Sequence, residues 1–397
     1  MNKQTVRDID LKDKRVLVRV DFNVPLDPQT KAISDDSRIR AALPTIKYLI
    51  DKKSKVILCS HLGRPNGKVV EDMRLAPVAK RLSELLKSPA PCTKDCIGPE
   101  VEEAISKMRE RDVLMLENLR FHAEEEKNDP VFAKALARLA DVYVNDAFGT
   151  AHRAHASTAG VTQYLPAVAG FLMEKEIDYL GKALAGAVRP FAAIIGGAKV
   201  SDKMALLENI LGKVDYLLIG GGMCCTFLKA QNYGVGKSQV EEDKLNVARD
   251  LMSKAAKAGV ELVLPEDVVV AEKFASGVPF KTVPIGSIPS DWYVMDIGPN
   301  TVRNYSDRLK QCKTAFWNGT MGVFEYKEFK AGTEGIARQL AILKATTITG
   351  GGSTAEAVME LGLDSKMSHV STGGGAALEF LEGKTLPGVA ALLDKKK

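Results

Sequence analysis

The chain has 397 residues, of which 45% are hydrophobic and 26% charged, and its formal net charge is +5 at pH 7. This length exceeds the roughly 250–300 residues at which a single hydrophobic core stops growing, so we expect two domains. The small charge argues against nucleic-acid binding, and no apolar run approaches the roughly 20 residues that span a membrane.

The start of the chain lacks the apolar stretch of a secretory signal. The cysteines are scattered and lack the paired spacing of zinc sites. They are Cys59, Cys92, Cys96, Cys224, Cys225 and Cys312. We therefore expect reduced thiols and a cytoplasmic protein.

The segment Arg15–Pro25 predicts a strand of β-branched residues that ends in a polar turn. Asp21 and Asn23 follow the carboxyl end of this strand, which is the edge where open α/β sheets bind ligands. A turn held by the two side chains is the alternative.

Capping residues at 34–37 precede a helical pattern that begins near Ile39, and Pro44 is expected to break or restart this helix. Arg38 then lies in the first turn, where a cation opposes the helix dipole. Its presence indicates an anion that needs both the helix terminus and a guanidinium. Arg40 is expected to meet only solvent.

Three more strands lead directly into basic turns. The strand at 55–60 precedes His61 and Arg64, the strand at 113–117 precedes Arg120, and the strand at 141–145 precedes Arg153. Guanidiniums gathered at one sheet edge repel one another unless an anion compensates them, and arginine suits bidentate contacts to phosphate or carboxylate. His61, His152 and His155 have no carboxylate at a familiar ligand spacing, so no metal is expected there.

An amphipathic helix is predicted near the middle of the chain, over Phe171–Leu184, with Pro166 and Pro190 on either side. The basic turns lie before this helix, and nearly all the glycine triplets lie after it. We therefore interpret it as a hinge between two domains. An ordinary surface helix within one domain is the alternative.

The second half contains strands followed by glycine-rich turns, at 191–197, 214–222, 345–352 and 368–375. Lys199 and Lys203 follow the first of these strands. Glycines between a strand and a helix let backbone amides approach phosphate oxygens closely. Tight packing of helix on strand is the alternative for any single triplet, but the repetition favours a nucleotide.

Two other nucleotide motifs are rejected. Gly236–Ser238 resembles the end of a Walker A loop, but Gln231 occupies the position of its first glycine. The spaced glycines of a dinucleotide site are absent, which argues against an NAD-dependent oxidoreductase. A further strand at 314–318 leads to Glu325, which is expected to begin a helix and either to cap it or to accept hydrogen bonds from a ribose.

A basic anion-binding half and a glycine-rich nucleotide half predict phosphoryl transfer between two bound substrates, with closure excluding water. No general base stands out. A carboxylate acceptor, which is already nucleophilic, fits this better than a hydroxyl.

The sequence resembles the phosphoglycerate kinase family over almost its whole length and in the family's order. The matching motifs are Arg19-Val-Asp-Phe-Asn-Val-Pro25, His61-Leu-Gly-Arg-Pro65, Glu117-Asn-Leu-Arg-Phe-His122, Gly196-Gly-Ala-Lys-Val200, Trp317-Asn-Gly319 and Ser371-Thr-Gly-Gly-Gly375. The resemblance implies reversible phosphoryl transfer between 1,3-bisphosphoglycerate and ADP, giving 3-phosphoglycerate and ATP in glycolysis with Mg²⁺, by a monomer.

The resemblance also implies the fold, two Rossmann-like three-layer α/β/α domains with mainly parallel sheets. Residues 1–170 would bind 3-phosphoglycerate, 171–185 would form the hinge helix, and 186–380 would bind the nucleotide. The tail from about 381 to 397 would return to the first domain.

Individual roles follow from the same resemblance. The triose phosphate would be bound by Asp21, Asn23, Arg38, His61, Arg64, Arg120 and Arg153. The nucleotide would be bound by Lys199, Lys203, Gly220, Gly221, Asn318, Glu325, Gly351, Gly352, Ser353 and Thr354. Arg38, Lys199, Lys203 and the amides of Gly351 and Gly352 would stabilise the charge of the moving group.

The chain departs from the family pattern at two positions. Ser353 stands where the family usually has an aspartate that helps to hold the metal nucleotide, so Mg²⁺ would be held mainly by phosphates and water. Thr320 replaces a usual proline. Ser353 is the one support for the alternative of a non-catalytic nucleotide-binding protein, and retention of Arg38 and Lys199 argues for activity.

Overall fold

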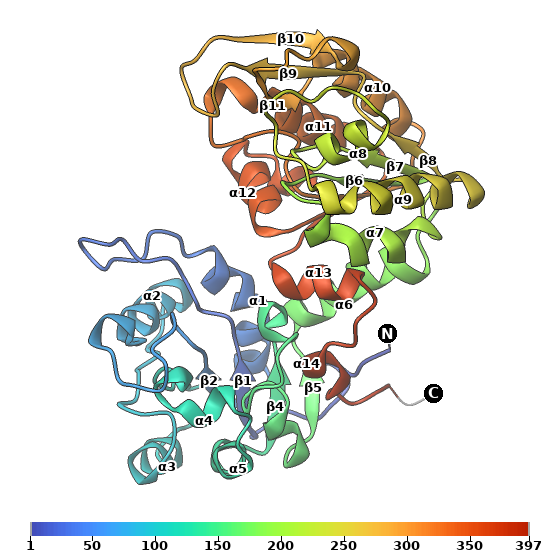
Figure 1. The fold of residues 1–397 in the computed structure, drawn as a ribbon. Coiled ribbons are helices and arrows are strands. Elements are labelled where there is room, and N and C mark those ends of the chain that lie inside the picture. The colour runs from blue at the N-terminus through green and yellow to red at the C-terminus, as the bar shows by residue number, and fades with distance from the viewer. Residues whose placement is uncertain (1, 396–397) are drawn as a thin grey trace. The chain divides into compact units, whose positions relative to one another are not determined.

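The computed structural model describes residues 2–395 and divides into two compact units (Figure 1). Unit 1 contains the chain up to Asp178 together with the segment from Thr385 onward, and unit 2 contains Tyr179–Lys384. Lys396 and Lys397, which belong to the predicted returning tail, lie outside the described residues.

Unit 1 is built on a parallel sheet in the order β3-β2-β1-β4-β5. Its strands are β1 (Arg15–Arg19), β2 (Lys55–Cys59), β3 (Val113–Met115), β4 (Val142–Asn145) and β5 (Ala167–Ala169). The central β1 pairs with β2 on one side and β4 on the other. All the carboxyl ends therefore meet at one edge, where the predicted basic turns begin.

Helices cover both faces of this sheet. They are α1 (Ser37–Asp51), α2 (Ala76–Leu86), α3 (Pro99–Ser106), α4 (Ala123–Glu126), α5 (Pro130–Ala137) and α14 (Pro387–Ala390). Val16 and Val18 pack in one apolar cluster with Ile46 of α1 and Val78 of α2. Leu17, which points to the opposite face, is equally buried. Burial on both faces explains why the strands are continuous apolar runs.

The expectation that Pro44 breaks its helix is wrong, because α1 runs through Pro44 without interruption. Proline removes the hydrogen bond to the carbonyl four residues earlier, here that of Arg40, which is exposed. Water can satisfy that carbonyl. Arg40 itself forms an ion pair with Asp36 at 2.7 Å instead of meeting only solvent.

The segment from Thr385 onward packs within unit 1. Leu386, Val389 and Leu392 are buried, and the backbone N–H of Leu393 donates to the carbonyl of Ala167 on β5 at 2.9 Å. Figure 1 shows α14 beside β5. Unit 1 is therefore completed by residues from both ends of the described chain.

Unit 2 contains a larger parallel sheet in the order β14-β13-β12-β6-β7-β8. Its strands are β6 (Phe191–Ile195), β7 (Tyr216–Ile219), β8 (Glu261–Val263), β12 (Thr314–Asn318), β13 (Thr346–Gly350) and β14 (His369–Val370). Its helices are α7 (Met204–Leu211), α8 (Cys224–Ala230), α9 (Leu245–Lys257), α10 (Pro299–Leu309), α11 (Ala331–Ile342), α12 (Gly352–Glu360) and α13 (Gly375–Leu381). Ile194 and Trp317 lie in one apolar cluster, whereas Ile195 and Phe316 are buried on the opposite face.

A second sheet in unit 2 was not predicted from the sequence. It is antiparallel, in the order β10-β9-β11, and its strands are β9 (Asp267–Ala271), β10 (Phe280–Pro284) and β11 (Tyr293–Ile297). Figure 1 shows it at one end of the unit. Apart from this addition, the predicted α/β fold with mainly parallel sheets is confirmed.

The segment interpreted as a hinge forms α6 (Phe171–Ala185), and the boundary between the units falls within it, after Asp178. Its first turn is anchored in unit 1. Phe171 N–H donates to Thr45 Oγ1 of α1 at 2.9 Å, and Leu172 N–H donates to Asp146 Oδ1 at 2.9 Å. No helix within residues 2–395 is both long enough and apolar enough to cross a membrane.

Candidate active site

Polar side chains after β1 organise the carboxyl edge of the unit 1 sheet. Asp21 accepts a hydrogen bond from Arg38 Nη1 in the first turn of α1, and the two form an ion pair. Asn23 Oδ1 accepts from the backbone N–H of Gly63 at 2.8 Å. Asp21 thus orients Arg38, and Asn23 fixes the turn that carries His61 and Arg64.

His61 is buried and neutral. Burial, followed by the charges of Arg19, Arg120 and Arg38, lowers the pKa of His61 well below its usual value. Its Nδ1 lies 3.1 Å from Arg19 Nη2. A guanidinium only donates hydrogen bonds, so Nδ1 accepts and the ring proton resides on Nε2. His61 can therefore donate to an anion without adding a positive charge to the site.

Arg19 belongs to a buried network that sequence analysis did not identify as part of the site. Its Nε donates to Ser157 Oγ at 2.9 Å, and Ser157 Oγ donates to Glu125 Oε1 at 2.5 Å. Ser157 N–H also donates to Glu125 Oε2 at 2.9 Å. All three residues are buried. The network links a buried carboxylate, through a hydroxyl, to the guanidinium that fixes the tautomer of His61.

The other predicted basic residues lie at the same edge. Arg120 is buried, donates from Nη1 to the carbonyl of Gly63 at 2.9 Å, and lies 3.3 Å from a carboxylate oxygen of Glu126. Burial, together with the charges of Arg19 and Arg153, lowers the pKa of Arg120. Arg64 and Arg153 are exposed.

A second buried histidine responds to the same charges. Burial, then the charges of Arg120, Arg19 and Arg153, lowers the pKa of His155 to about 4. The charges of Arg38 and Arg120 thus act on His61, and that of Arg153 acts on Arg120 and His155. Arg64 lies in the turn that is fixed by the hydrogen bond from Gly63 N–H to Asn23 Oδ1.

Several predicted glycines of unit 2 serve to pack loops together. A Cβ on Gly196 would lie 2.2 Å from the carbonyl oxygen of Thr320, and one on Gly221 would lie 2.5 Å from the backbone nitrogen of Gly197. A Cβ on Gly220 would lie 2.5 Å from Met321 Sδ. For these positions the packing alternative is favoured. No side chain fits where the loops after β6, β7 and β12 converge.

Gly352, the first residue of α12, is different. A Cβ on Gly351, which has φ +93°, would lie 2.9 Å from Asn318 Nδ2, whereas one on Gly352 would meet nothing within 4 Å. The amides at the start of α12 are therefore approachable, and a helix N-terminus favours an anion. Thr354 is buried, and its Oγ1 accepts from the N–H of Gly319 at 2.7 Å, which ties α12 to the loop after β12.

Lys203 and Asn318 lie beside this helix start. Lys203 Nζ donates to Asn318 Oδ1, and Asn318 Nδ2 donates to the carbonyl of Gly350 at 2.8 Å. Burial lowers the pKa of Lys203. Lys199 is exposed in the turn after β6. A cation, an amide and free backbone N–H groups thus converge on one place.

A cavity of about 590 Å³ opens near these loops. Ser353, Glu325, Gly221 and Thr320 contribute to its lining. Its other wall, which was not predicted from the sequence, comes from the antiparallel sheet and adjoining loops. These residues are Phe274, Tyr293, Val294, Met295 and Asp296, with Lys237, Ser238 and Gln239 alongside. An aromatic and apolar wall opposite polar loops is typical of a site for a planar heterocycle with a charged tail.

The expectation that Glu325 begins a helix is wrong. It lies exposed in a turn, and α11 begins only at Ala331. The start of α11 is held by Asp296, whose Oδ2 accepts from Gly332 N–H at 2.7 Å. Glu325 is therefore free of a capping role and lines the cavity.

Comparison with known proteins gives one consistent result. The sequence model described as phosphoglycerate kinase matches residues 6–384. The chain is 58% identical to the phosphoglycerate kinase of Moorella thermoacetica, and the match covers both chains completely. It is 60% identical to the phosphoglycerate kinase of Synechococcus elongatus, and this match covers 99% of the chain and 100% of the relative.

Solved structures agree. The phosphoglycerate kinase of Coxiella burnetii matches with a TM-score of 0.90 and 42% sequence identity. That of Pyrococcus horikoshii matches with a TM-score of 0.85 and 33% sequence identity, and each match covers 98% of both chains. The resemblance stated from the motifs is confirmed, and the chain belongs to the phosphoglycerate kinase family of phosphoryl-transferring enzymes.

Proposed function

We propose that unit 1 binds the three-carbon phosphate and unit 2 the nucleotide in the reaction of this family, the reversible transfer of a phosphoryl group between 1,3-bisphosphoglycerate and ADP in glycolysis. One observation carries the assignment to unit 1. A neutral histidine with its proton on Nε2 lies among several arginines whose charges act on it. Such a site favours a multiply charged anion over a neutral ligand.

In unit 1, Asp21 and Asn23 would position Arg38 and the His61 turn, while Arg64, Arg120 and Arg153 bind the phosphate and carboxylate groups. In unit 2, the apolar wall would receive the base, and Glu325 would accept hydrogen bonds from the ribose. Lys199, Lys203 and Asn318 would contact the phosphates, with Ser353, Thr354 and the open amides of Gly351 and Gly352 at the start of α12. Gly220 and Gly221 would hold the loop shape.

No general base is needed, because the acceptor is a carboxylate. The protein's part is to position the groups and stabilise the charge of the transferring phosphoryl group. We assign this role to Arg38, Lys199, Lys203 and the amides of Gly351 and Gly352. The ion pair of Arg38 with Asp21 supports it, because it fixes a guanidinium before substrate arrives.

The residues present fit a magnesium ion that arrives with the nucleotide. Mg²⁺ prefers oxygen ligands and keeps several waters, so one or two protein oxygens suffice. The Ser353 hydroxyl and the Glu325 carboxylate line the cavity. Both oxygens of Asp296 already accept backbone N–H groups, Ile297 at 2.9 Å and Gly332 at 2.7 Å. When bound, the ion would neutralise phosphate charge.

The proposal also includes a hinge at α6, a monomer and a cytoplasmic location. The hinge is supported by the position of the unit boundary within α6 and by the anchoring of its first turn in unit 1. Sedimentation at several concentrations tests the monomer, and cell fractionation tests the location.

The deciding experiment measures ATP formation from ADP and enzymatically generated 1,3-bisphosphoglycerate while Mg²⁺ is varied. We expect robust turnover that requires Mg²⁺. Arg38→Ala should lower kcat by on the order of 10³, as other arginines that stabilise transferring phosphoryl groups do. Nucleotide binding without turnover at saturating Mg²⁺ would overturn the proposed function, and near-normal kcat in Arg38→Ala would remove Arg38 from its role.

A further inference from the structure

A second group of ligand-type side chains lies in unit 1. Asp95 and Cys96 come from the loop before α3, and His122 immediately precedes α4. The carboxylate oxygen, sulfur and imidazole nitrogen of these residues all lie within 4.8 Å of one another. Asp95 Oδ1 and His122 Nε2 are 2.6 Å apart. Cys96 is buried, His122 half-buried and Asp95 exposed.

We propose that Asp95, Cys96 and His122 form a binding site for Zn²⁺. Zinc takes thiolate, imidazole and carboxylate ligands in a tetrahedral arrangement, and three protein ligands leave the fourth position to water. A soft sulfur ligand selects against Mg²⁺, which prefers oxygen alone. The site is therefore separate in both place and chemistry from the metal nucleotide proposed for unit 2.

The geometry requires only small movements. Zinc–ligand bonds of about 2.0–2.3 Å place tetrahedral ligand atoms roughly 3.3–3.8 Å apart. The contact between Asp95 and His122, which is 2.6 Å, must open by roughly 0.7–1.2 Å, and no other pair of ligand atoms is more than 4.8 Å apart. Cys96 is fixed by burial, whereas the other two ligands have room to adjust.

Neighbouring contacts hold the ligands in place. Asp95 Oδ1 also accepts the backbone N–H of Cys96 at 2.6 Å, and the carbonyl of Asp95 accepts Thr93 Oγ1 at 2.6 Å. The His122 ring packs on Phe132 with centroids 5.2 Å apart. Such supporting contacts are typical of metal sites. Burial raises the pKa of the Cys96 thiol, so zinc binding releases the sulfur proton to solvent.

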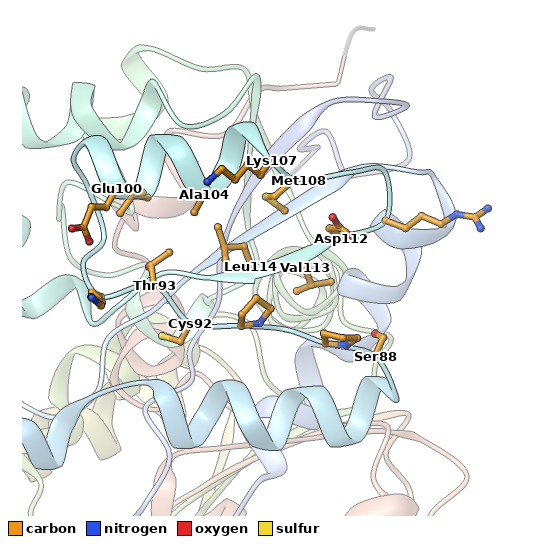
Figure 2. Close-up of a pocket in the computed structure, with 15 residues that line it drawn as sticks. Ser88, Cys92, Thr93, Glu100, Ala104, Lys107, Met108, Asp112, Val113 and Leu114 are labelled. Carbon is orange, nitrogen blue, oxygen red and sulfur yellow. The ribbon is translucent and has the colours of Figure 1, made fainter.

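A nearby cysteine supplies a matched control. Cys92 lines a different cavity, of about 570 Å³, between the loop before α3 and α3 itself, with Met108 and Leu114 (Figure 2). Burial raises the pKa of the Cys92 thiol to about 12. Cys92 is thus a comparably protonated thiol four residues from Cys96, but it is not part of the cluster.

The test uses Co²⁺, a coloured substitute for Zn²⁺, added to the metal-free full-length chain. A cysteine ligand produces a thiolate-to-cobalt charge-transfer band, and tetrahedral geometry produces intense visible bands. We expect both to saturate at one Co²⁺ per chain and to disappear when Zn²⁺ is added. Neither signal depends on catalytic activity, so failure of this proposal is distinguishable from failure of the proposed function.

Substitutions of the three residues test which of them bind the metal. Cys96→Ser should abolish the charge-transfer band, and Cys92→Ser should retain it. Loss of a supporting residue alone weakens metal affinity about 10–100-fold, so Asp95→Asn and His122→Gln, which remove ligands, should weaken Zn²⁺ binding by at least about 100-fold. These two variants change less buried positions and serve if Cys96→Ser does not fold. The absence of a band in the parent chain, or a band that survives Cys96→Ser, would overturn the proposal.

Discussion

A guanidinium as buried as that of Arg19 needs compensating partners, because an unpaired buried charge is strongly unfavourable. Glu125 is one such partner: burial raises the pKa of its carboxyl, whereas the charge of Arg19 and the hydrogen bonds from Ser157 lower it. Ser157 connects the two by accepting from Arg19 and donating to Glu125. The same guanidinium donates to His61 Nδ1. The hydroxyl of Ser157 therefore acts on substrate binding only through its neighbours, which makes it a positioning group.

Ser157→Ala should show how the hydroxyl affects stability and how it affects substrate binding. Removing the hydroxyl leaves Arg19 Nε without its acceptor, and we expect the free energy of unfolding to fall by about 1–3 kcal/mol. KM for 3-phosphoglycerate should rise, because His61 loses a fixed orientation, while KM for ATP stays unchanged. Urea denaturation and initial rates measure the two effects. Ser106→Ala, at an exposed position on α3, is the control. An equal rise in both KM values would contradict the positioning role.

Ser353→Asp tests the metal assignment. A carboxylate at this position of the cavity should bind the magnesium of the nucleotide complex, and a charge-assisted contact is worth about 1.5–3 kcal/mol. We expect Mg-ATP to bind about tenfold more tightly or better, by titration calorimetry. ATP in the presence of EDTA should show no such gain. Ser353→Asn controls for size, and unchanged Mg-ATP affinity would exclude Ser353 from the metal site.

The residues after β1 and β2 could be predicted from sequence, because polar groups that follow apolar strands stand out within a few positions. Ser157 and Glu125 could not, since they lie more than 100 residues from Arg19 along the chain. Local spacing carries no sign of such a contact. Their only signal is a strand that contains an arginine, Arg19, among buried valines.

At the scale of elements, the start of α6 depends on residues far from it in sequence. The first N–H groups of a helix have no partner within the helix. Here Thr45 and Asp146 accept those of Phe171 and Leu172, and a Cβ on Gly170 would lie 2.2 Å from Asp146 Oδ1. The first turn of α6 is thus fixed to unit 1, so any bending must occur after it.

Asp146→Asn should change the pH dependence of stability. Burial raises the pKa of Asp146 to about 6. The folded chain therefore keeps this proton longer than the unfolded chain does. The contribution of the carboxyl to stability is complete below about pH 4 and is lost as the pH rises through about 6. Asparagine resembles the protonated form and does not titrate.

We therefore expect the variant to gain stability relative to the parent chain between pH 4 and pH 8, by at most about 3 kcal/mol. His61 and His155, whose lowered pKa values act in the opposite direction, are common to both chains and cancel. Urea denaturation followed by circular dichroism at several pH values measures the difference. Asp10→Asn, at an exposed position, should show none. A difference that does not vary with pH would contradict the assignment.

Elements differ in how well the sequence predicts them. The buried strand β6 is recognisable because five apolar residues stand between a proline and a glycine pair. The antiparallel sheet was missed, although Val268–Val270 is a strand signal, because β10 is mostly exposed and does not form an apolar run. Pro44 was misassigned because a local rule cannot tell whether the carbonyl that loses its hydrogen bond faces water. Glu325 was misassigned because local sequence does not show that Asp296 holds the start of α11.

At the scale of the whole molecule, the chain crosses between its two units twice, within α6 and again at Lys384. Unit 2 is thus an insertion in unit 1, whose sheet depends on the final segment for Leu386, Val389 and Leu392. Both tryptophans, Trp292 and Trp317, belong to unit 2. Tryptophan fluorescence therefore reports on one unit alone, whereas circular dichroism reports on both.

Leu392→Ala should destabilise unit 1 selectively. Truncating a buried leucine costs about 2–5 kcal/mol. We expect an earlier unfolding step by circular dichroism and an unchanged tryptophan transition in urea. Leu393→Ala, at the exposed neighbouring position, should leave both nearly unchanged. Equal shifts of the two transitions in Leu392→Ala would show that the units unfold together.

The return of the final segment to unit 1 also sets an order for folding during synthesis. Ribosomes add roughly 5–20 residues per second, so the stretch of about 200 residues that forms unit 2 takes about 10–40 s to make. Throughout that time the unit 1 sheet lacks the residues that cover β5. Unit 2 can fold as soon as its own chain has emerged. Unit 1 begins first but is completed only after unit 2 has been made, and the nascent chain exposes apolar surface around β5 until the segment from Thr385 onward has emerged.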